Sequence, residues 1–272
     1  MYETLYLRAS SLDEALAWLR EHEDARPLSG GMTLIPTLKQ RLAAPSHLID
    51  LTRIEALRGI SVQGGVLHVG APTRHAEVAA SPVVEAAIPA LAQLANVIAD
   101  PQVRNRGTMG GSVANNDPAA DYPSAVLALG AQVVTSKRRI AADDYFVDTF
   151  QTALEPDELV IGFEYPVPLR AAYAKLRQPA SGYAVVGVFV AQFADSIRVA
   201  VTGAGASVFR WFDAEAALRA DLSEATLACL KMDSGSLPDD DNGSAAYRAH
   251  LIETYTRRAV QALLGQPLRQ PA

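Results

Sequence analysis

Hydrophobic positions near the start of the chain recur at the spacing of an amphipathic helix. Leu12, Leu16 and Leu19 fall on one helical face, and Ser11 just before them is a typical helix cap. Apolar runs predict the neighbouring elements: a strand over 2–7, a helix over about 34–42 and a strand over 48–51. The first 55 residues therefore predict a small β-α-β-α-β unit.

The middle of the chain mixes strand and helix patterns. Gln63-Gly64-Gly65 lies between two alternating runs, which predicts a β-hairpin over 59–70. Further patterns predict helices over 73–80 and 89–98 and strands over 131–136 and 158–165. Residues 100–121 are rich in Gly, Asn, Asp and Pro and have little periodicity, so we expect a long irregular segment, which inside a compact domain is usually functional.

The last hundred residues form a second unit. Three β-rich runs over 183–193, 197–202 and 207–212 are separated by turn residues, and a helical pattern covers 245–264. This order predicts an α+β unit in which a three-stranded antiparallel sheet is followed by helices.

Composition and charge narrow the function classes. The 272 residues are 49% hydrophobic and 20% charged, and the net charge of −6 argues against a nucleic-acid-binding protein. No apolar run approaches the roughly 20 residues of a membrane helix, and the N-terminal residues lack the pattern of a secretory signal, so we expect a cytoplasmic location. A single cysteine, Cys229, excludes a metal or iron–sulfur site built on cysteines of this chain, and we expect its side chain to be buried. The five histidines show no i, i+4 pair, so we expect no metal site.

Two glycine-rich stretches carry the candidate chemistry. Residues 28–34 read LSGGMTL, and residues 106–116 read RGTMGGSVANN. Paired glycines allow successive backbone N–H groups to point into one concavity that suits phosphate, although a plain turn is the alternative for each stretch. Asp117 and Asp121 follow the second stretch, where a carboxylate suits a ribose; alternatively, Asp117 starts a turn and Asp121 caps a helix over 122–129. Two such stretches favour a dinucleotide.

Standard nucleotide motifs do not explain these stretches. The chain contains no Gly-x-x-x-x-Gly-Lys-Ser/Thr sequence. Gly203-Ala204-Gly205 follows a predicted strand, but Val208 stands where a third glycine would be, and the next residues read as strand. We therefore expect a hairpin turn there.

Three motifs in order resemble a known family. The segments LSGGMTLIPTLKQRLAAPSHLIDL, RNRGTMGGSVANNDPAADYPSAVLALGA and KLRQPASGYAVVGV are similar to the FAD-binding medium subunits of molybdenum hydroxylases. Carbon monoxide dehydrogenase medium subunits are the nearest type, and the FAD domain of xanthine dehydrogenase is a more distant relative. The similarity runs from about residue 2 to 268. The chain departs from the family mildly, with Ser112 where Asn is common and Met109 where Ile or Leu is usual.

The resemblance implies a fold and a set of cofactor-binding residues. The implied fold is an α+β, two-subdomain FAD-binding domain of the vanillyl-alcohol-oxidase (PCMH) type over residues 1–170, with subdomains of about 1–55 and 56–170. A small C-terminal α+β domain follows over 171–272. The implied FAD-binding residues are Ser29, Gly30, Gly31, Met32, Thr33, Leu34, Gly107, Thr108, Gly110, Gly111, Ser112, Asn115, Asp121, Val160, Lys175 and Tyr183.

Two of these residues have an equally simple alternative. Lys175 matches a lysine at the family's cofactor site, or it is a solvated lysine on a strand. Tyr183 lies in the loop expected near the flavin ring, which it stacks on or shields, or it fills the junction between domains.

The resemblance also implies a role. Such a subunit works in a heterotrimer, often doubled, with a large molybdopterin-binding subunit that selects the substrate and a small subunit carrying [2Fe–2S] clusters. It accepts electrons from those clusters and passes them to an external acceptor, which stays open among NAD, oxygen, a quinone and a carrier protein. No catalytic acid, base or nucleophile on this chain is implied. The alternatives are a stand-alone FAD oxidoreductase of the same fold, which would turn over a substrate alone, and a non-enzymatic binding module, which would fail to bind FAD.

Overall fold

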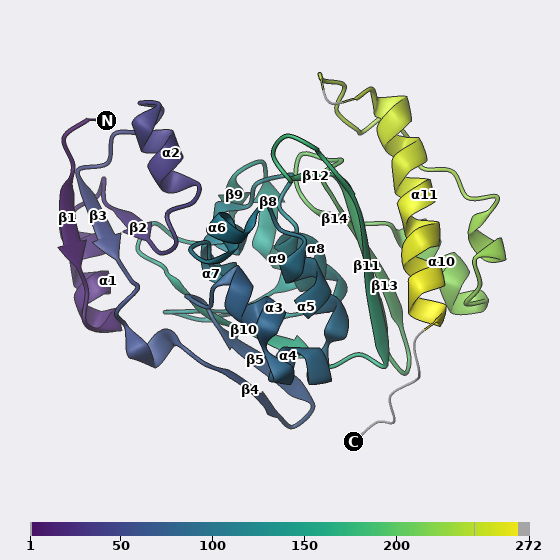
Figure 1. Cartoon of the computed structure of the whole chain (residues 1–272), viewed down its shortest axis with the longest axis horizontal. Helices are drawn as coiled ribbons and strands as arrows, with labels where there is room; N and C mark the ends of the chain where they lie inside the picture. The colour runs from purple at the N-terminus through teal and green to yellow at the C-terminus, as the bar shows by residue number, and fades with distance from the viewer. Residues whose placement is uncertain (1, 242, 266–272) are drawn as a thin grey trace.

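The computed structural model describes residues 2–241 and 243–265, and it is a mixed helix and sheet protein (Figure 1). Its helices are α1 Leu12–Glu21, α2 Leu34–Lys39, α3 His75–Ala80, α4 Pro82–Ala87, α5 Pro89–Asn96, α6 Pro101–Arg104, α7 Met109–Asn115, α8 Tyr122–Ala128, α9 Ala142–Tyr145, α10 Phe212–Ala220 and α11 Ala245–Leu264. Its strands are β1 Leu5–Arg8, β2 Arg26–Leu28, β3 His47–Asp50, β4 Ile60–Gln63, β5 Val66–Gly70, β6 Gln132–Thr135, β7 Arg139–Ala141, β8 Phe146–Asp148, β9 Gln151–Thr152, β10 Val160–Pro166, β11 Arg170–Arg177, β12 Ala184–Gln192, β13 Ile197–Thr202 and β14 Phe209–Arg210.

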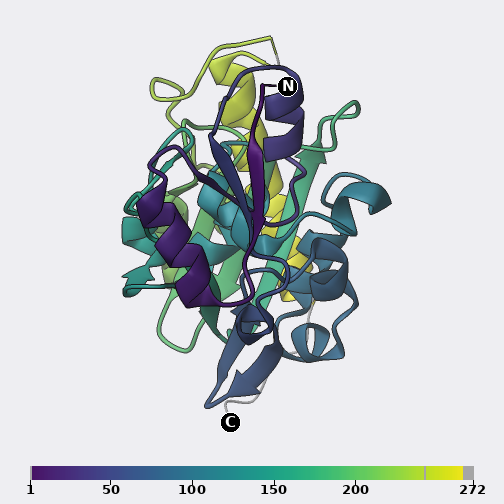
Figure 2. The ribbon, with the colours of Figure 1, turned by 90° about the vertical axis from the view of Figure 1, so that its left-hand side faces the viewer.

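The N-terminal unit is the small β-α-β-α-β arrangement that the sequence predicts. Its three strands pair in parallel in the order β1-β3-β2, and this unit faces the viewer in Figure 2. Helix α1 begins where predicted, because the Ser11 hydroxyl accepts a hydrogen bond from the backbone N–H of Glu14. Ala15, Leu16 and Leu19 bury their side chains against the sheet residue Ile49. Helix α2 ends at Lys39, three residues earlier than expected.

The middle unit is an antiparallel sheet in the order β4-β5-β10-β6-β7. Helices α5, α7 and α8 share a core with the strand residues Leu67, Val133 and Phe163. At the other side, Leu159 and Ile161 pack into the core of the N-terminal unit. The middle sheet therefore holds the N-terminal unit and the central helices in fixed positions relative to each other.

The C-terminal sheet, in the order β11-β12-β13-β14, is buried on both faces. Successive residues of a strand point to opposite faces, so Phe189 packs into the core of the middle unit while Val188 and Val190 pack with α10 and α11. Figure 1 shows α11 along the outer face of this sheet. The sheet thus separates two hydrophobic cores and contributes side chains to both. The predicted boundary between an FAD-binding domain over 1–170 and a C-terminal domain over 171–272 stays a proposal.

Three further expectations differ from the structure. Residues 100–121 are less irregular than expected, because they contain α6 and α7. The C-terminal sheet has four strands rather than three, since Arg170–Arg177 also forms a strand that pairs along its whole length with β12. Cys229 was expected to be buried but is exposed, because it lies beyond the short turn at Ala225–Leu227 instead of inside a longer helix.

Candidate cofactor-binding site

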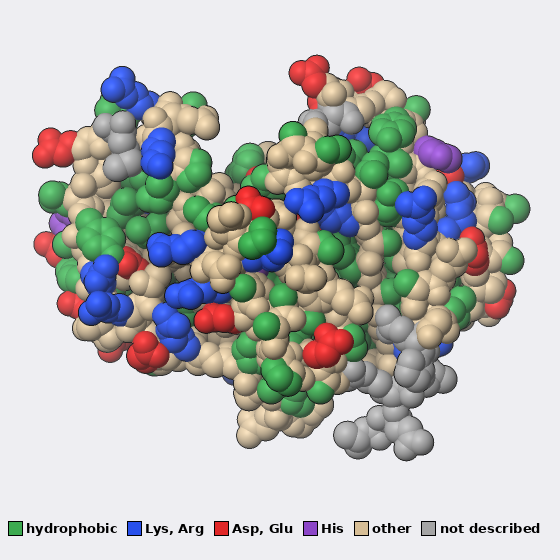
Figure 3. All heavy atoms as spheres, in the orientation of Figure 1, with side chains coloured by type: hydrophobic (Ala, Val, Ile, Leu, Met, Phe, Trp, Pro, Cys, Tyr) green, Lys and Arg blue, Asp and Glu red, His purple; other side chains and the backbone are tan. Residues whose placement is uncertain are grey.

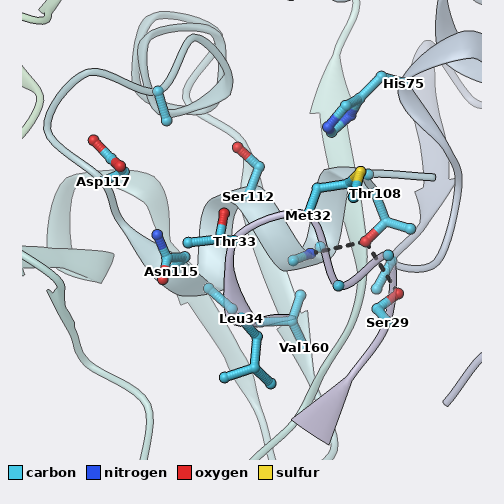
Figure 4. Close-up of a pocket in the computed structure, with 18 of the residues that line it drawn as sticks. Ser29, Met32, Thr33, Leu34, His75, Thr108, Ser112, Asn115, Asp117 and Val160 are labelled. Atoms are coloured by element: carbon cyan, nitrogen blue, oxygen red, sulfur yellow. Dashed lines mark hydrogen bonds between the residues drawn. The ribbon is translucent and has the colours of Figure 1, made fainter. Parts of the chain in front are cut away.

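A cavity of about 470 Å³ lies where the N-terminal unit meets the central helices. Figure 3 shows the surface hollowed between the lobe at the left and the centre of the molecule, and Figure 4 shows residues that line the cavity. One wall is the loop after β2, the opposite wall is built by α7 and the segment from Asp117 to Asp121, and the loop at Ser181–Tyr183 closes one side. The volume is that of a pocket for a ligand of drug or cofactor size.

The first glycine loop offers unused hydrogen-bond donors to this cavity. Within the described residues, no hydrogen bond engages the backbone N–H of any residue from Gly30 to Leu34. All five residues line the cavity. Gly31 adopts a positive φ of 71°, a backbone conformation that favours glycine and lets neighbouring N–H groups converge. Consecutive free amides of this kind form a site for an anion such as phosphate.

The second glycine loop has most of its backbone donors already engaged, although no hydrogen bond within the described residues engages the N–H of Thr108. The N–H of Met109 donates to the carbonyl oxygen of Thr73 at 2.9 Å, and that of Gly110 donates to the carbonyl oxygen of Ala71 at 2.8 Å. The N–H of Gly111 donates to the Thr108 hydroxyl at 3.2 Å, which caps α7. The backbone of this loop is therefore mainly a support, and its contribution to a ligand comes from side chains such as Ser112 and Asn115 at the cavity wall.

The glycines at two positions are required by close protein packing. A Cβ atom on Gly30 would lie 2.2 Å from the carbonyl oxygen of Arg106, so the two loops can meet only if residue 30 is glycine. A Cβ atom on Gly110 would lie 2.6 Å from the Cβ atom of Ala71. The Thr108 hydroxyl also donates to the Ser29 hydroxyl at 3.0 Å, which ties the loops together (Figure 4). The two walls of the cavity therefore meet at these contacts, which set the position of one loop relative to the other.

Asp121 lies at the floor of the cavity in a buried ion pair. Its carboxylate accepts a hydrogen bond from the Tyr173 hydroxyl at 2.5 Å and from the Lys175 ammonium at 2.9 Å. Burial raises the pKa of the Asp121 carboxyl, and the charge of Lys175 opposes that rise. Lys175 also donates to the carbonyl oxygen of Val97 at 3.3 Å. The pair therefore joins β11 to two segments near the cavity, and the Asp121 side chain makes no capping hydrogen bond to α8.

Asp117 and Tyr183 give the cavity its polar end. The Asp117 carboxylate accepts a hydrogen bond from the N–H of Ala119 at 2.9 Å, a turn contact, and it also lines the cavity. Burial raises the pKa of Asp117. Burial and then the Asp117 charge raise the pKa of Tyr183, which lines the cavity although its side chain is 41% exposed. A carboxylate here suits ligand hydroxyl groups, which donate hydrogen bonds.

The cavity gathers all the predicted cofactor-binding residues except one. The residues at its wall are Ser29, Gly30, Gly31, Met32, Thr33, Leu34, Gly107, Thr108, Gly110, Gly111, Ser112, Asn115, Asp121, Val160 and Tyr183. Lys175 is neither at the cavity wall nor solvated, since its side chain is only 5% exposed and lies against Asp121. Met109, a departure from the family pattern, is buried with its sulfur 3.2 Å from the Tyr165 hydroxyl.

Sequence reasoning missed other residues at the wall. Arg26, His75 and Pro72 all line the cavity but stand outside the glycine-rich stretches. His75 had no motif around it, and only the pairing of its backbone N–H with the carbonyl oxygen of Gly107 at 3.0 Å brings it here. That contact joins residues far apart in the sequence, so no local pattern could indicate it.

The residues present fit FAD. Free amides of the first loop suit its diphosphate, the Asp117 carboxylate suits hydroxyl groups, and the cavity wall includes the apolar side chains of Leu34 and Val160 for rings. Among the described residues, no cluster of three or more His, Cys, Asp or Glu side chains is placed to hold a metal ion.

Known proteins match the chain over most of its length. The family model "FAD binding domain in molybdopterin dehydrogenase" matches residues 1–168. The carbon monoxide dehydrogenase medium chain of Hydrogenophaga pseudoflava is 34% identical over 94% of this chain and 96% of its own. The nicotine 6-hydroxylase medium subunit of Paenarthrobacter nicotinovorans is 35% identical over 94% and 95%. A solved structure, reconstituted CO dehydrogenase from Oligotropha carboxidovorans, superposes with a TM-score of 0.89 at 32% identity, covering 97% of this chain and 99% of that one.

Proposed function

The chain belongs to the family of FAD-binding domains in molybdopterin dehydrogenases, and we propose that it works as the electron-transferring medium subunit of a molybdenum hydroxylase. It is an oxidoreductase flavoprotein subunit by this membership. In the proposed role it accepts electrons from [2Fe–2S] clusters of a small partner subunit and passes them to an external acceptor.

One observation carries the proposal at the level of this chain. Five consecutive backbone N–H groups, from Gly30 to Leu34, line a cavity without a partner in the described chain. Consecutive unpaired amides that converge on one cavity favour an anion, because their N–H dipoles present positive charge to it. The sixteen cofactor-binding residues predicted from the sequence are part of the proposal, with Lys175 acting through Asp121.

The roles of the residues follow from their places. The first loop binds the diphosphate, and the second loop holds the first in position through Thr108 and Ser29. Asp117 accepts hydrogen bonds from hydroxyl groups. Tyr183 lines one end of the cavity, and its partial exposure leaves that end accessible to a partner or acceptor. Bound FAD supplies the redox chemistry, and the chain supplies position and access.

The proposed partners are a large molybdopterin-binding subunit and a small [2Fe–2S] subunit, assembled as a dimer of heterotrimers. Relatives of similar identity are named for carbon monoxide and for nicotine as substrates. Medium subunits that resemble this chain about equally thus serve different substrates, which supports substrate selection by the large subunit. No helix in the described chain is long and apolar enough to cross a membrane. The cytoplasmic location expected from the sequence belongs to the same proposal.

Flavin binding by the purified full chain tests the proposal. We expect a bound-flavin absorbance spectrum after FAD is added and excess is removed, and an affinity at least about tenfold higher for FAD than for riboflavin, which lacks the diphosphate. Absence of bound flavin from both the isolated chain and its native complex would contradict the proposal. Equal affinities for FAD and riboflavin would contradict the role of the first loop.

A further inference from the structure

His75 places a buried, unpaired nitrogen beside the proposed diphosphate loop. The residue begins α3, lines the cavity and is 5% exposed, and its Nδ1 atom has no hydrogen-bond partner in residues 2–241 or 243–265. Figure 4 shows the imidazole pointing from α3 into the cavity, toward the side where Met32 and Thr108 lie. A buried polar atom without a partner destabilises a protein. Within the described residues no hydrogen bond engages the other ring nitrogen, Nε2, either, and Nε2 is not fully buried, so it is the nitrogen that a ligand in the cavity can reach.

The ring is held firmly in this place. The backbone N–H of His75 donates to the carbonyl oxygen of Gly107, and a Cβ atom on Gly107 would lie 2.5 Å from Nε2 of the ring. The Tyr122 ring packs at a centroid distance of 5.3 Å. The imidazole therefore fills a fitted space between the second glycine loop and α8.

The ring stays neutral at physiological pH. Burial, and then the charge of Arg104, lower the pKa of His75 to about 4. A neutral imidazole has one N–H donor and one acceptor nitrogen, so it can donate one hydrogen bond without adding a charge to the site.

We propose that His75 is a further cofactor-binding residue, whose imidazole N–H donates a hydrogen bond to a diphosphate oxygen of FAD. This role rests on the proposed function. In this arrangement the first loop binds the diphosphate from one wall of the cavity, and His75 binds it from another. The second loop contributes by positioning both, since Thr108 contacts Ser29 and Gly107 contacts His75.

Two variants of the full chain test the proposal by titration with FAD and with ADP, which carries a diphosphate without a flavin. His75→Leu removes the donor and should weaken binding of both about tenfold or more, because hydrogen bonds to charged groups are strong. His250→Leu, at an exposed position of α11, should bind both as the unaltered chain does. Unchanged affinity in His75→Leu would overturn the proposal, and so would an equal loss in both variants.

A second measurement covers the case in which His75→Leu folds poorly. In the unaltered chain, the nitrogen-15 resonances of the His75 ring should shift when ADP or FAD is added. Unchanged ring resonances at saturating FAD would overturn the role of His75 and leave the proposed function standing. If the unaltered chain binds no FAD at all, the proposed function fails together with this inference.

Discussion

The two glycine loops look alike in sequence but differ in what their backbones do. From Gly30 to Leu34 every backbone N–H lacks a partner in the described chain, whereas those of Met109, Gly110 and Gly111 are all engaged. The first loop is therefore a set of donors, and the second is a support that packs against Ala71. Close approach of protein atoms requires glycine in both loops, at Gly30 and at Gly110, so the difference between the loops lies in their backbone N–H groups.

The largest effect is expected from a bulky side chain placed where the second glycine loop packs against Ala71. Gly110→Val should lower the free energy of unfolding by at least roughly 4 kcal/mol, because its side chain would meet Ala71 at well under contact distance. FAD binding would then be lost through misfolding. Urea denaturation of the FAD-free chain measures the effect.

Gly111→Ala is the matched control for that variant. A Cβ atom at position 111 meets only the Thr108 hydroxyl at 3.0 Å, so its unfolding midpoint should stay close to that of the unaltered chain. A Gly110→Val chain as stable as Gly111→Ala would show that the second loop is not a packed support.

Breaking the ion pair below the second loop should have the next largest effect. Lys175→Met leaves the buried Asp121 carboxylate without its cation and should lower the free energy of unfolding by roughly 3–5 kcal/mol. Lys231→Met is the control, because Lys231 is 77% exposed in its ion pair with Glu253 and should contribute at most about 1 kcal/mol. Equal losses in the two variants, measured by denaturation, would argue against the structural role of Lys175.

The pH dependence of the free energy of unfolding tests the environment of the His75 imidazole, which packs against Gly107. Because the folded pKa of His75 is lowered to about 4 from 6.5, the unfolded chain binds a proton between these values while the folded chain does not. Stability should therefore fall as pH falls through this range, and His75 should account for about 2 kcal/mol between pH 7 and pH 5.

Urea denaturation of His75→Leu at pH 7 and at pH 5 isolates the contribution of His75 to this pH dependence. Arg104 and Tyr122, which face the ring, are unchanged in that variant. The difference in unfolding free energy between pH 7 and pH 5 should shrink by about 2 kcal/mol. An unchanged difference would mean that the imidazole is charged or solvated in the folded chain.

The link between the loops should give the smallest effect. Thr108→Val removes the cap of α7 and the hydrogen bond to Ser29, and should destabilise the chain by about 1 kcal/mol. Ser29→Ala removes only the link and should cost less. A double-mutant cycle on the unfolding free energies should show coupling; strict additivity would mean that the loops are not joined through this pair.

The sequence predicted those helices and strands that are set by local features: hydrophobic period, capping residues and turn residues. Helix α11 begins and ends where its period indicates, and Ser11 caps α1 as expected. The same holds for the hairpin of β4 and β5, which is set by its turn residues. Strand β11 was missed because its alanine-rich sequence has little strand propensity, and pairing with β12 decides its conformation.

The parts of the candidate site that consist of short, continuous sequence motifs were predicted. Both glycine loops and Asp121 were identified from the sequence, and they meet at one cavity. Helix α7 was missed because Gly110 and Gly111 disfavour a helix, which here is stabilised by the Thr108 cap and packing on Ala71. His75 was missed because only tertiary contacts bring it to the cavity.

Amide hydrogen exchange, resolved by residue with and without FAD, tests the contrast between the loops most directly. In the free chain, the amides from Gly30 to Leu34 should exchange fast while those from Met109 to Ser112 exchange slowly. FAD should slow exchange in the first loop by a large factor and change the second loop little. Slow exchange at Gly30 to Leu34 before FAD is added, or protection by FAD confined to the second loop, would contradict the account.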